Sequence, residues 1–209
     1  MAVTTHEPEH PTSTGLSHRK LLMWTFLGSE CLFFGTLIAN HMINRNQAEL
    51  LNGVSPACVL DIPITSASTF VLLMSSVAMV LAVTASERGD MKQLRIWLFM
   101  TAILGSTFLG FQVYEFSAFV DEGLTIGTNL YGSTFFILTG FHGVHVTVGV
   151  IWILSMLAVS YRRRDLVIGN PLNVDITGLY WHFVDVVWIV IFTVVYLVGA
   201  IGLNCTEVV

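Results

Sequence analysis

The chain has 209 residues, of which 54% are hydrophobic and only 11% are charged, and its formal net charge is −5. Soluble domains carry about 25% charged residues, so this composition excludes an ordinary soluble protein and favours one embedded in a membrane. The nine Lys and Arg residues form no basic domain. A nucleic-acid-binding protein is therefore excluded as well.

Five apolar stretches are each long enough to cross a bilayer, which takes ~20 helical residues. We expect these spans at residues 21–43, 64–85, 94–118, 131–161 and 176–203. All five prolines lie outside the spans, as expected of unbroken helices that satisfy their own backbone hydrogen bonds in lipid. The sequence therefore predicts an all-α integral membrane protein, a bundle of five transmembrane helices.

The basic residues are concentrated in alternate gaps between the spans. Eight of the nine lie on one side, and Arg45 alone lies on the other. The positive-inside rule then predicts a cytoplasmic N-terminus and a C-terminus outside. Residues 1–18 are polar and contain two prolines, so we expect a flexible cytoplasmic tail there and one membrane domain at 19–209.

Five ionisable side chains lie inside the apolar spans: Glu30, His142, His145, His182 and Asp185. A charge at membrane depth costs ~2.5 kcal/mol or more, so such residues persist when they are paired or used. The two carboxyl groups each lie ~15 Å along their helices from the nearest charged residue outside the span. Both are therefore expected near the middle of the membrane.

The spacing of these residues predicts pairs. His142 and His145 are three residues apart, as are His182 and Asp185, so each pair shares one face of its helix. A neutral imidazole offers one donor and one acceptor, which satisfies a carboxyl group without an isolated charge. We predict that Glu30 pairs with His145 and Asp185 with His182, although depth does not distinguish His142 from His145.

Each of these residues also has an ordinary structural interpretation. A buried glutamate can be a protonated, hydrogen-bonded contact between helices, which is common in membranes. The three span histidines could ligate a haem, but axial ligands must face each other across a cavity. We expect no catalytic residue and no metal site in this chain. Cys58 and Cys205 both fall on the predicted outer side, where a disulfide is conceivable but unpaired thiols are expected.

Small residues recur at every fourth position in two spans, and such stripes let helices approach closely. We therefore expect helix contacts at Gly35 and Ala39 in the first span and at Ala102, Ser106 and Gly110 in the third.

Aromatic residues near the span ends are expected to anchor the protein at the membrane interface: Trp24, Trp97, Tyr131 and Trp181. Glu115 lies ~30 Å along its helix from Arg95, so we expect it at the outer interface.

Two long segments of the later spans invite comparison with known families: 140–149 (GFHGVHVTVG) and 180–197 (YWHFVDVVWIVIFTVVYL). Both resemble the signature segments of subunit III of the haem-copper terminal oxidases. The segment 28–35 (GSECLFFG) resembles the membrane-glutamate segment of that family, which makes Glu30 its buried carboxyl group. The segment 110–116 (GFQVYEF) resembles the family's helix with a Gln or Glu and then an outer Glu, here Gln112 and Glu115.

The resemblance covers residues 21–202 and matches the short bacterial form with five helices, which lacks the first two of seven. It implies an accessory, itself non-catalytic subunit of a proton-pumping cytochrome c oxidase in the bacterial cytoplasmic membrane. The polar residues of the spans would form the family's internal network. Haem and copper would lie in the partners, catalytic subunit I and subunit II, with small or supercomplex subunits as further partners. The chain itself would bind phospholipid and no other cofactor.

Three alternatives remain open. Subunits III of quinol oxidases and of nitric-oxide-reductase-associated complexes share these motifs, so the electron donor is undetermined. An independent proton or solute transporter would place Glu30 and Asp185 along an aqueous route, but the chain shows no inverted repeat and no proline break within a span. A small di-haem cytochrome would be recognised by the absorption spectrum of the isolated chain.

Overall fold

The structure is a computed structural model that describes residues 15, 17–44, 62–121, 123, 125–127, 129–162 and 171–198. Its helices are α1 (His18–Asn44), α2 (Ile62–Glu87), α3 (Met91–Asp121), α4 (Leu130–Arg162), α6 (Leu172–Ile191) and the short π-helix η3 (Phe192–Leu197). Because η3 continues α6, the described residues form five helices long and apolar enough to cross a membrane. All five predicted spans are confirmed as helices of sufficient length, while 199–203, the end of the last expected span, lies outside the described residues.

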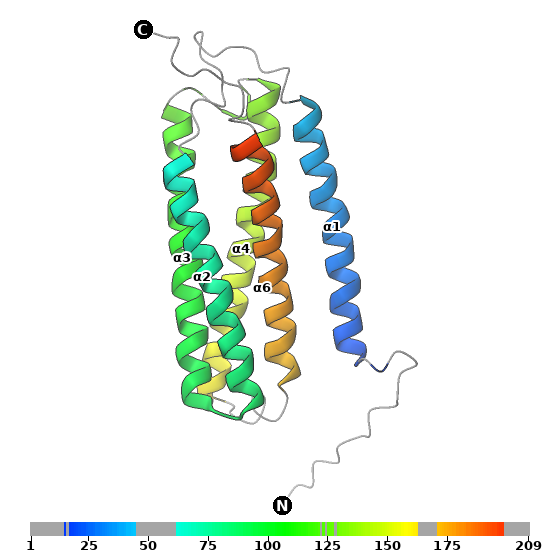
Figure 1. The fold of residues 1–209 in the computed structure, drawn as a ribbon, viewed down its shortest axis with the longest axis vertical. Helices are drawn as coiled ribbons and strands as arrows, with labels where there is room; N and C mark the ends of the chain where they lie inside the picture. Colours follow the sequence, from blue (N-terminus) through cyan, green and yellow to red (C-terminus); the bar gives the residue numbers. More distant parts are fainter. Residues whose placement is uncertain are drawn as a thin grey trace, which may run out of the picture.

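Four helices form a bundle, and the first stands at its side. The pairs α2 with α3, α3 with α4, α2 with α6 and α4 with α6 pack together, whereas α1 packs on α4 and α6 (Figure 1). A tight turn joins α2 to α3: Gly89 adopts a left-handed conformation with φ of 71°, which favours glycine. Asp90 then caps α3 by accepting hydrogen bonds from the backbone N–H groups of Lys92 and Gln93.

Helix α1 buries a narrow stripe. Its buried residues, Met23, Leu27, Phe34 and His41, are spaced at intervals of four and seven, which places them on one face. The opposite face is apolar and exposed, with Leu32 74% accessible. Such a surface suits lipid tails or a neighbouring membrane subunit.

Trp181 lies at the centre of the bundle. Its side chain is fully buried, and its indole Nε1 donates to Ser75 Oγ of α2 at 3.0 Å. The ring lies against two glycines: a Cβ built on Gly105 would be 2.5 Å from Cη2 of Trp181, and one on Gly149 would be 2.8 Å from Cζ3. The expectation that Trp181 anchors at the interface is therefore wrong. Tyr131 is also buried, whereas Trp24 is exposed as expected.

The stripes of small residues do not bring the helices of this chain together. Gly35, Ala39, Ser106 and Gly110 are exposed, and a Cβ on Gly35 or Gly110 would meet no atom within 4 Å. Only Ala102 of the five predicted packing residues is buried. Spacing of four identifies residues on one helix face but does not say whether that face lies inside the bundle. This expectation is corrected accordingly.

The basic residues that the structure describes gather at one end of the bundle, which we call the basic end. Helix α1 begins there, α2 ends there, α3 begins there and α4 ends there (Figure 1). These termini carry Arg19, Lys20, Arg88, Lys92, Arg95 and Arg162. Residues 1–14, Arg45, Cys58 and Cys205 lie outside the described residues, so the predicted tail and the state of these two cysteines remain predictions.

Candidate functional site

Glu30 and His145 form the predicted contact between α1 and α4. His145 Nε2 lies 3.2 Å from Glu30 Oε2, and each side chain is 18% exposed. Glu30 is twelve residues from the start of α1 and fourteen from its end, so the pair lies near the middle of the helix. The structure thereby distinguishes His145 from His142 as the partner of Glu30.

The hydrogen bonds of His145 determine how many protons the pair holds. Its Nδ1 lies 2.8 Å from the backbone carbonyl of Phe141, which can only accept, so Nδ1 carries a hydrogen. A second proton must then lie between Nε2 and the carboxyl oxygen, because two lone pairs would repel each other. The pair is net neutral whether that proton is on Glu30 or on His145. This neutrality makes the pair tolerable at membrane depth.

His142 is placed differently from its neighbour. It is fully buried, and neither ring nitrogen has a hydrogen-bond partner among the described residues. The ring stacks on Trp188 with centroids 4.9 Å apart and meets the edge of Phe108 at 6.0 Å. His142 therefore packs as a flat ring inside an aromatic cluster, beside the polar pair but not in it.

The predicted pair of His182 and Asp185 does not form. His182 Nδ1 lies 2.6 Å from Ser76 Oγ of α2, so a hydroxyl on another helix satisfies the imidazole. Ser76 also faces the Asp185 carboxyl group, yet neither carboxyl oxygen makes a hydrogen bond of good geometry within the part of the chain described. Three-residue spacing puts both side chains on one face of α6, where both approach Ser76 and not each other. This prediction is wrong.

Gln112 and Glu115 are buried between helices. Gln112 Nε2 donates to the Thr139 carbonyl of α4 at 2.7 Å. The side-chain amide packs closely on Gly143 of the same helix: a Cβ built on that glycine would be 2.8 Å from Gln112 Oε1. Glu115 accepts a hydrogen bond from the Thr65 hydroxyl of α2. It also faces Tyr196 of η3. Glu115 is thus buried between helices, six residues before the end of α3 at Asp121, and its expected place at the level of the outer interface stays a prediction.

Two contacts of α1 were not predicted. Near one end, Lys20 Nζ forms an ion pair with Asp175 Oδ2 of α6 at 2.7 Å. Near the other, the buried His41 lies with Nδ1 3.0 Å from Thr134 Oγ1 of α4. His41 is a fourth histidine in the spans. It lies near the end of the predicted span at 21–43, so the sequence did not indicate a buried contact there.

Together with Glu30–His145, these two contacts are the three α1 polar contacts. They lie ten and eleven residues apart, which is ~15 Å and ~16 Å along the helix. They secure a helix that buries little apolar surface, and the middle one joins two groups of which either can carry the proton of their hydrogen bond. Within the described ranges, no three His, Cys, Asp or Glu side chains are grouped to hold a metal ion.

Comparison with known proteins agrees with this architecture. A family model described as cytochrome c oxidase subunit III matches residues 5–200. The chain is 41% identical over 180 residues to quinol oxidase subunit 3 of Bacillus spizizenii, covering 86% of this chain and 87% of that protein. It is 36% identical over 195 residues to cytochrome c oxidase subunit 3 of Bacillus sp. strain PS3, covering 93% of each. The chain therefore belongs to the family of subunit III of the haem-copper oxidases.

Proposed function

We propose that this chain is the accessory third subunit of a proton-pumping aerobic terminal oxidase, the complex that reduces oxygen to water. It performs no electron transfer itself. It binds structural phospholipid, and it supports the stability and proton uptake of the catalytic subunit. The main support for this proposal is the Glu30–His145 contact, because it joins α1 to α4 through two groups that can exchange a proton.

Two properties of this contact suit a supporting role in proton handling. Both side chains are partly exposed, so the shared proton is accessible from the surface of the subunit. Transfer of the proton between Nε2 and Oε2 leaves the net charge of the pair unchanged, which avoids the cost of a new charge in the membrane. Tyr180 of α6 also donates to the His145 carbonyl at 3.0 Å and holds that turn of α4 in place.

The apolar outer surface supports the lipid part of the proposal. Large apolar side chains are exposed along the helices, as on the outer face of α1. Lipid held on such a surface would keep water away from the neighbouring subunit. It would also admit oxygen, because that molecule is apolar and dissolves in hydrocarbon.

The proposal places haem and copper in partner subunits I and II, in a bacterial cytoplasmic membrane. The positive-inside rule puts the basic end, and with it the N-terminus, on the cytoplasmic side. Cytochrome c is the proposed electron donor. Quinol is the alternative, because relatives named as subunits of both kinds of oxidase match the chain.

Native purification tests this function. The chain is expected to co-purify with larger subunits that show a haem Soret band, and to lose that band once the partners are removed. A Soret band that persists in the isolated chain would contradict the proposal. Oxygen consumption by the complex with reduced cytochrome c and, separately, with a quinol identifies the donor.

A further inference from the structure

One face of α3 lines two cavities that follow each other along the helix. Lys92, Ile96, Phe99, Ile103 and Ser106 are spaced at intervals of three and four, which places them on a single face. The first cavity, at the basic end, has a volume of about 550 Å³ and includes Lys92 and Ile96 in its lining. The second, of about 330 Å³, begins one turn further on and includes Phe99, Ile103 and Ser106.

Helix α4 lines the other side of both cavities. Tyr161 borders the first and Leu154 borders the second. These two residues are seven positions apart, two turns of α4, so they share one face. The two cavities therefore lie in line between α3 and α4, and we refer to them together as the α3–α4 groove.

The end of the groove at the basic end carries excess positive charge. Lys92 is exposed and forms no ion pair with any residue described. Arg95 donates through Nε to Ser160 Oγ at 3.2 Å, and its guanidinium lies 4.2 Å from the ring centroid of Tyr161. Asp90 is the one acid in the lining, and its Oδ1 is engaged by the start of α3. A fixed guanidinium beside a free ammonium suits a phosphate group.

The rest of the groove is apolar. Its floor consists of the small residues Ala102 and Ser106, and Phe99, Ile103 and Leu154 line it with larger side chains. From Arg95 to Thr107, at the far end, is twelve residues, or ~18 Å. One leaflet of a ~30 Å hydrocarbon core is ~15 Å thick, so the groove is as long as one leaflet is deep.

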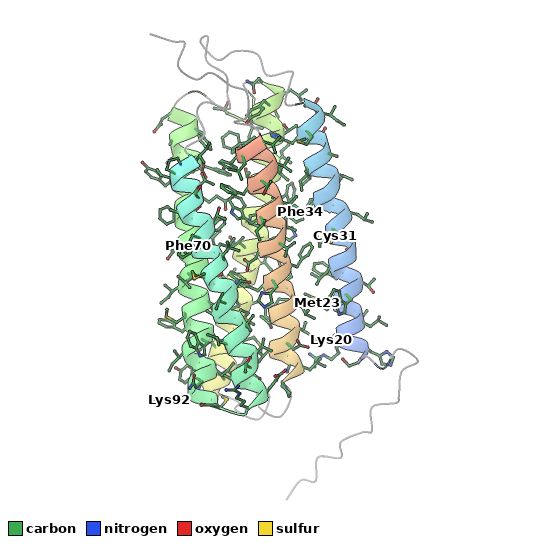
Figure 2. The ribbon with its side chains drawn as sticks, in the orientation of Figure 1. Lys20, Met23, Cys31, Phe34, Phe70 and Lys92 are labelled. Atoms are coloured by element: carbon green, nitrogen blue, oxygen red, sulfur yellow. The ribbon has the colours of Figure 1, made fainter. Side chains whose placement is uncertain are left out.

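We infer that the α3–α4 groove binds an anionic glycerophospholipid, with its phosphate on Lys92 and Arg95 and one acyl chain along Phe99, Ile103 and Ser106. This site deepens the lipid-binding part of the proposed function and rests on it. It is separate from the Glu30–His145 pair: Lys92 lies at the same end of the bundle as Lys20, on the side away from α1 (Figure 2).

Native mass spectrometry of the full chain in detergent tests the charged end. Phosphatidylglycerol is expected to be retained in preference to phosphatidylcholine with the same acyl chains. Lys92→Gln is expected to weaken phosphatidylglycerol binding about fivefold, the effect of one basic residue near an anionic headgroup. Arg88→Gln removes the same charge from the same end outside the groove, so it serves as the control. Equal retention of both lipids, or an equal loss in both variants, would overturn the site.

The apolar part needs a separate variant. Ser106→Phe places a ring in the groove and is expected to reduce lipid retention at least as much as Lys92→Gln. Ser117→Phe is the matched control, because Ser117 is an exposed serine of the same helix that also bonds a carbonyl of its own helix and lines neither cavity. Unchanged retention in Ser106→Phe would refute the acyl-chain position.

A transmembrane helix of a partner subunit is the competing occupant of the groove. It would be revealed if Ser106→Phe released a subunit from the purified complex while lipid binding by the chain stayed the same, and this result also overturns the inference. Co-purified haem tests the proposed function, and lipid bound to the isolated chain tests the lipid site. A chain without a haem partner can still bind lipid, and the reverse, so the two failures are distinguishable.

Discussion

Replacement of Glu30 separates the effect of its hydrogen bond from that of its charge. Because Nδ1 of His145 donates to Phe141, Nε2 of the neutral ring is an acceptor, and the amide of Glu30→Gln can donate to it. We expect this variant to keep the free energy of unfolding within ~0.5 kcal/mol of the parent. Glu30→Leu removes the donor and leaves Nε2 partly buried without a partner, which costs ~1–3 kcal/mol. The 18% exposure of both side chains favours the lower end of that range.

Unfolding of the purified chain in detergent, followed by tryptophan fluorescence, measures these differences. A double-mutant cycle with Glu30→Leu and His145→Leu isolates the contact, and we expect a coupling energy of ~0.6–1.7 kcal/mol, the range for polar contacts between membrane helices. In the assembled oxidase, Glu30→Gln also removes the exchangeable proton. We expect normal initial turnover followed by faster inactivation. Glu115→Gln, the same substitution at a buried glutamate outside this contact, is the matched control.

Two results would refute this reasoning. If Glu30→Gln destabilised the chain as much as Glu30→Leu, the contact would depend on a full charge and not on a shared proton. If Glu30→Gln matched the parent in turnover number, inactivation rate and bound lipid, Glu30 would be only a packing contact between α1 and α4.

Four further variants test the packing and the polar contacts. Gly105→Ala places a Cβ 2.5 Å from the buried indole ring of Trp181, and this overpacking costs ~1–3 kcal/mol. The cost outweighs the ~1 kcal/mol gain in helix propensity, so we expect a net loss of stability. Gly110→Ala adds its Cβ in open space, so we expect a gain. Unfolding shifts of the same sign would contradict this. Asp185→Leu is expected to preserve or raise stability, because it removes two buried oxygens without well-formed hydrogen bonds in the described structure; a clear loss in the same assay would reveal a partner. Lys20→Met removes the ion pair with Asp175, and we expect a loss of at most ~1 kcal/mol that shrinks in high salt. A loss independent of salt would point to packing of the lysine stem.

The features that depend on one helix at a time were predictable. Hydropathy and the position of the prolines identified the five spans, because crossing a bilayer imposes length and composition directly. The contact of Glu30 with His145 was also predicted, because an ionisable residue in lipid has few suitable partners.

The failures concern which face of a helix lies inside and which neighbour it meets. Spacing put His182 beside Asp185, but Ser76 of α2 lies closer in space and satisfies the imidazole. The position of Trp181 near a span start suggested the interface, yet Gly105 and Gly149 on two other helices make room for it in the core. Such information is divided among segments far apart in the chain, and no single segment reveals it.

The place of α1 has a consequence for biosynthesis. It is the first of the described helices to be translated, but its three polar contacts are with α4 and α6, which are translated last. During insertion, Glu30 and His41 must therefore remain without these partners until α4 has been made, and Lys20 until α6 has begun. Helix α1 is therefore held by its own polar contacts only late in synthesis, after α2 and α3 have been made.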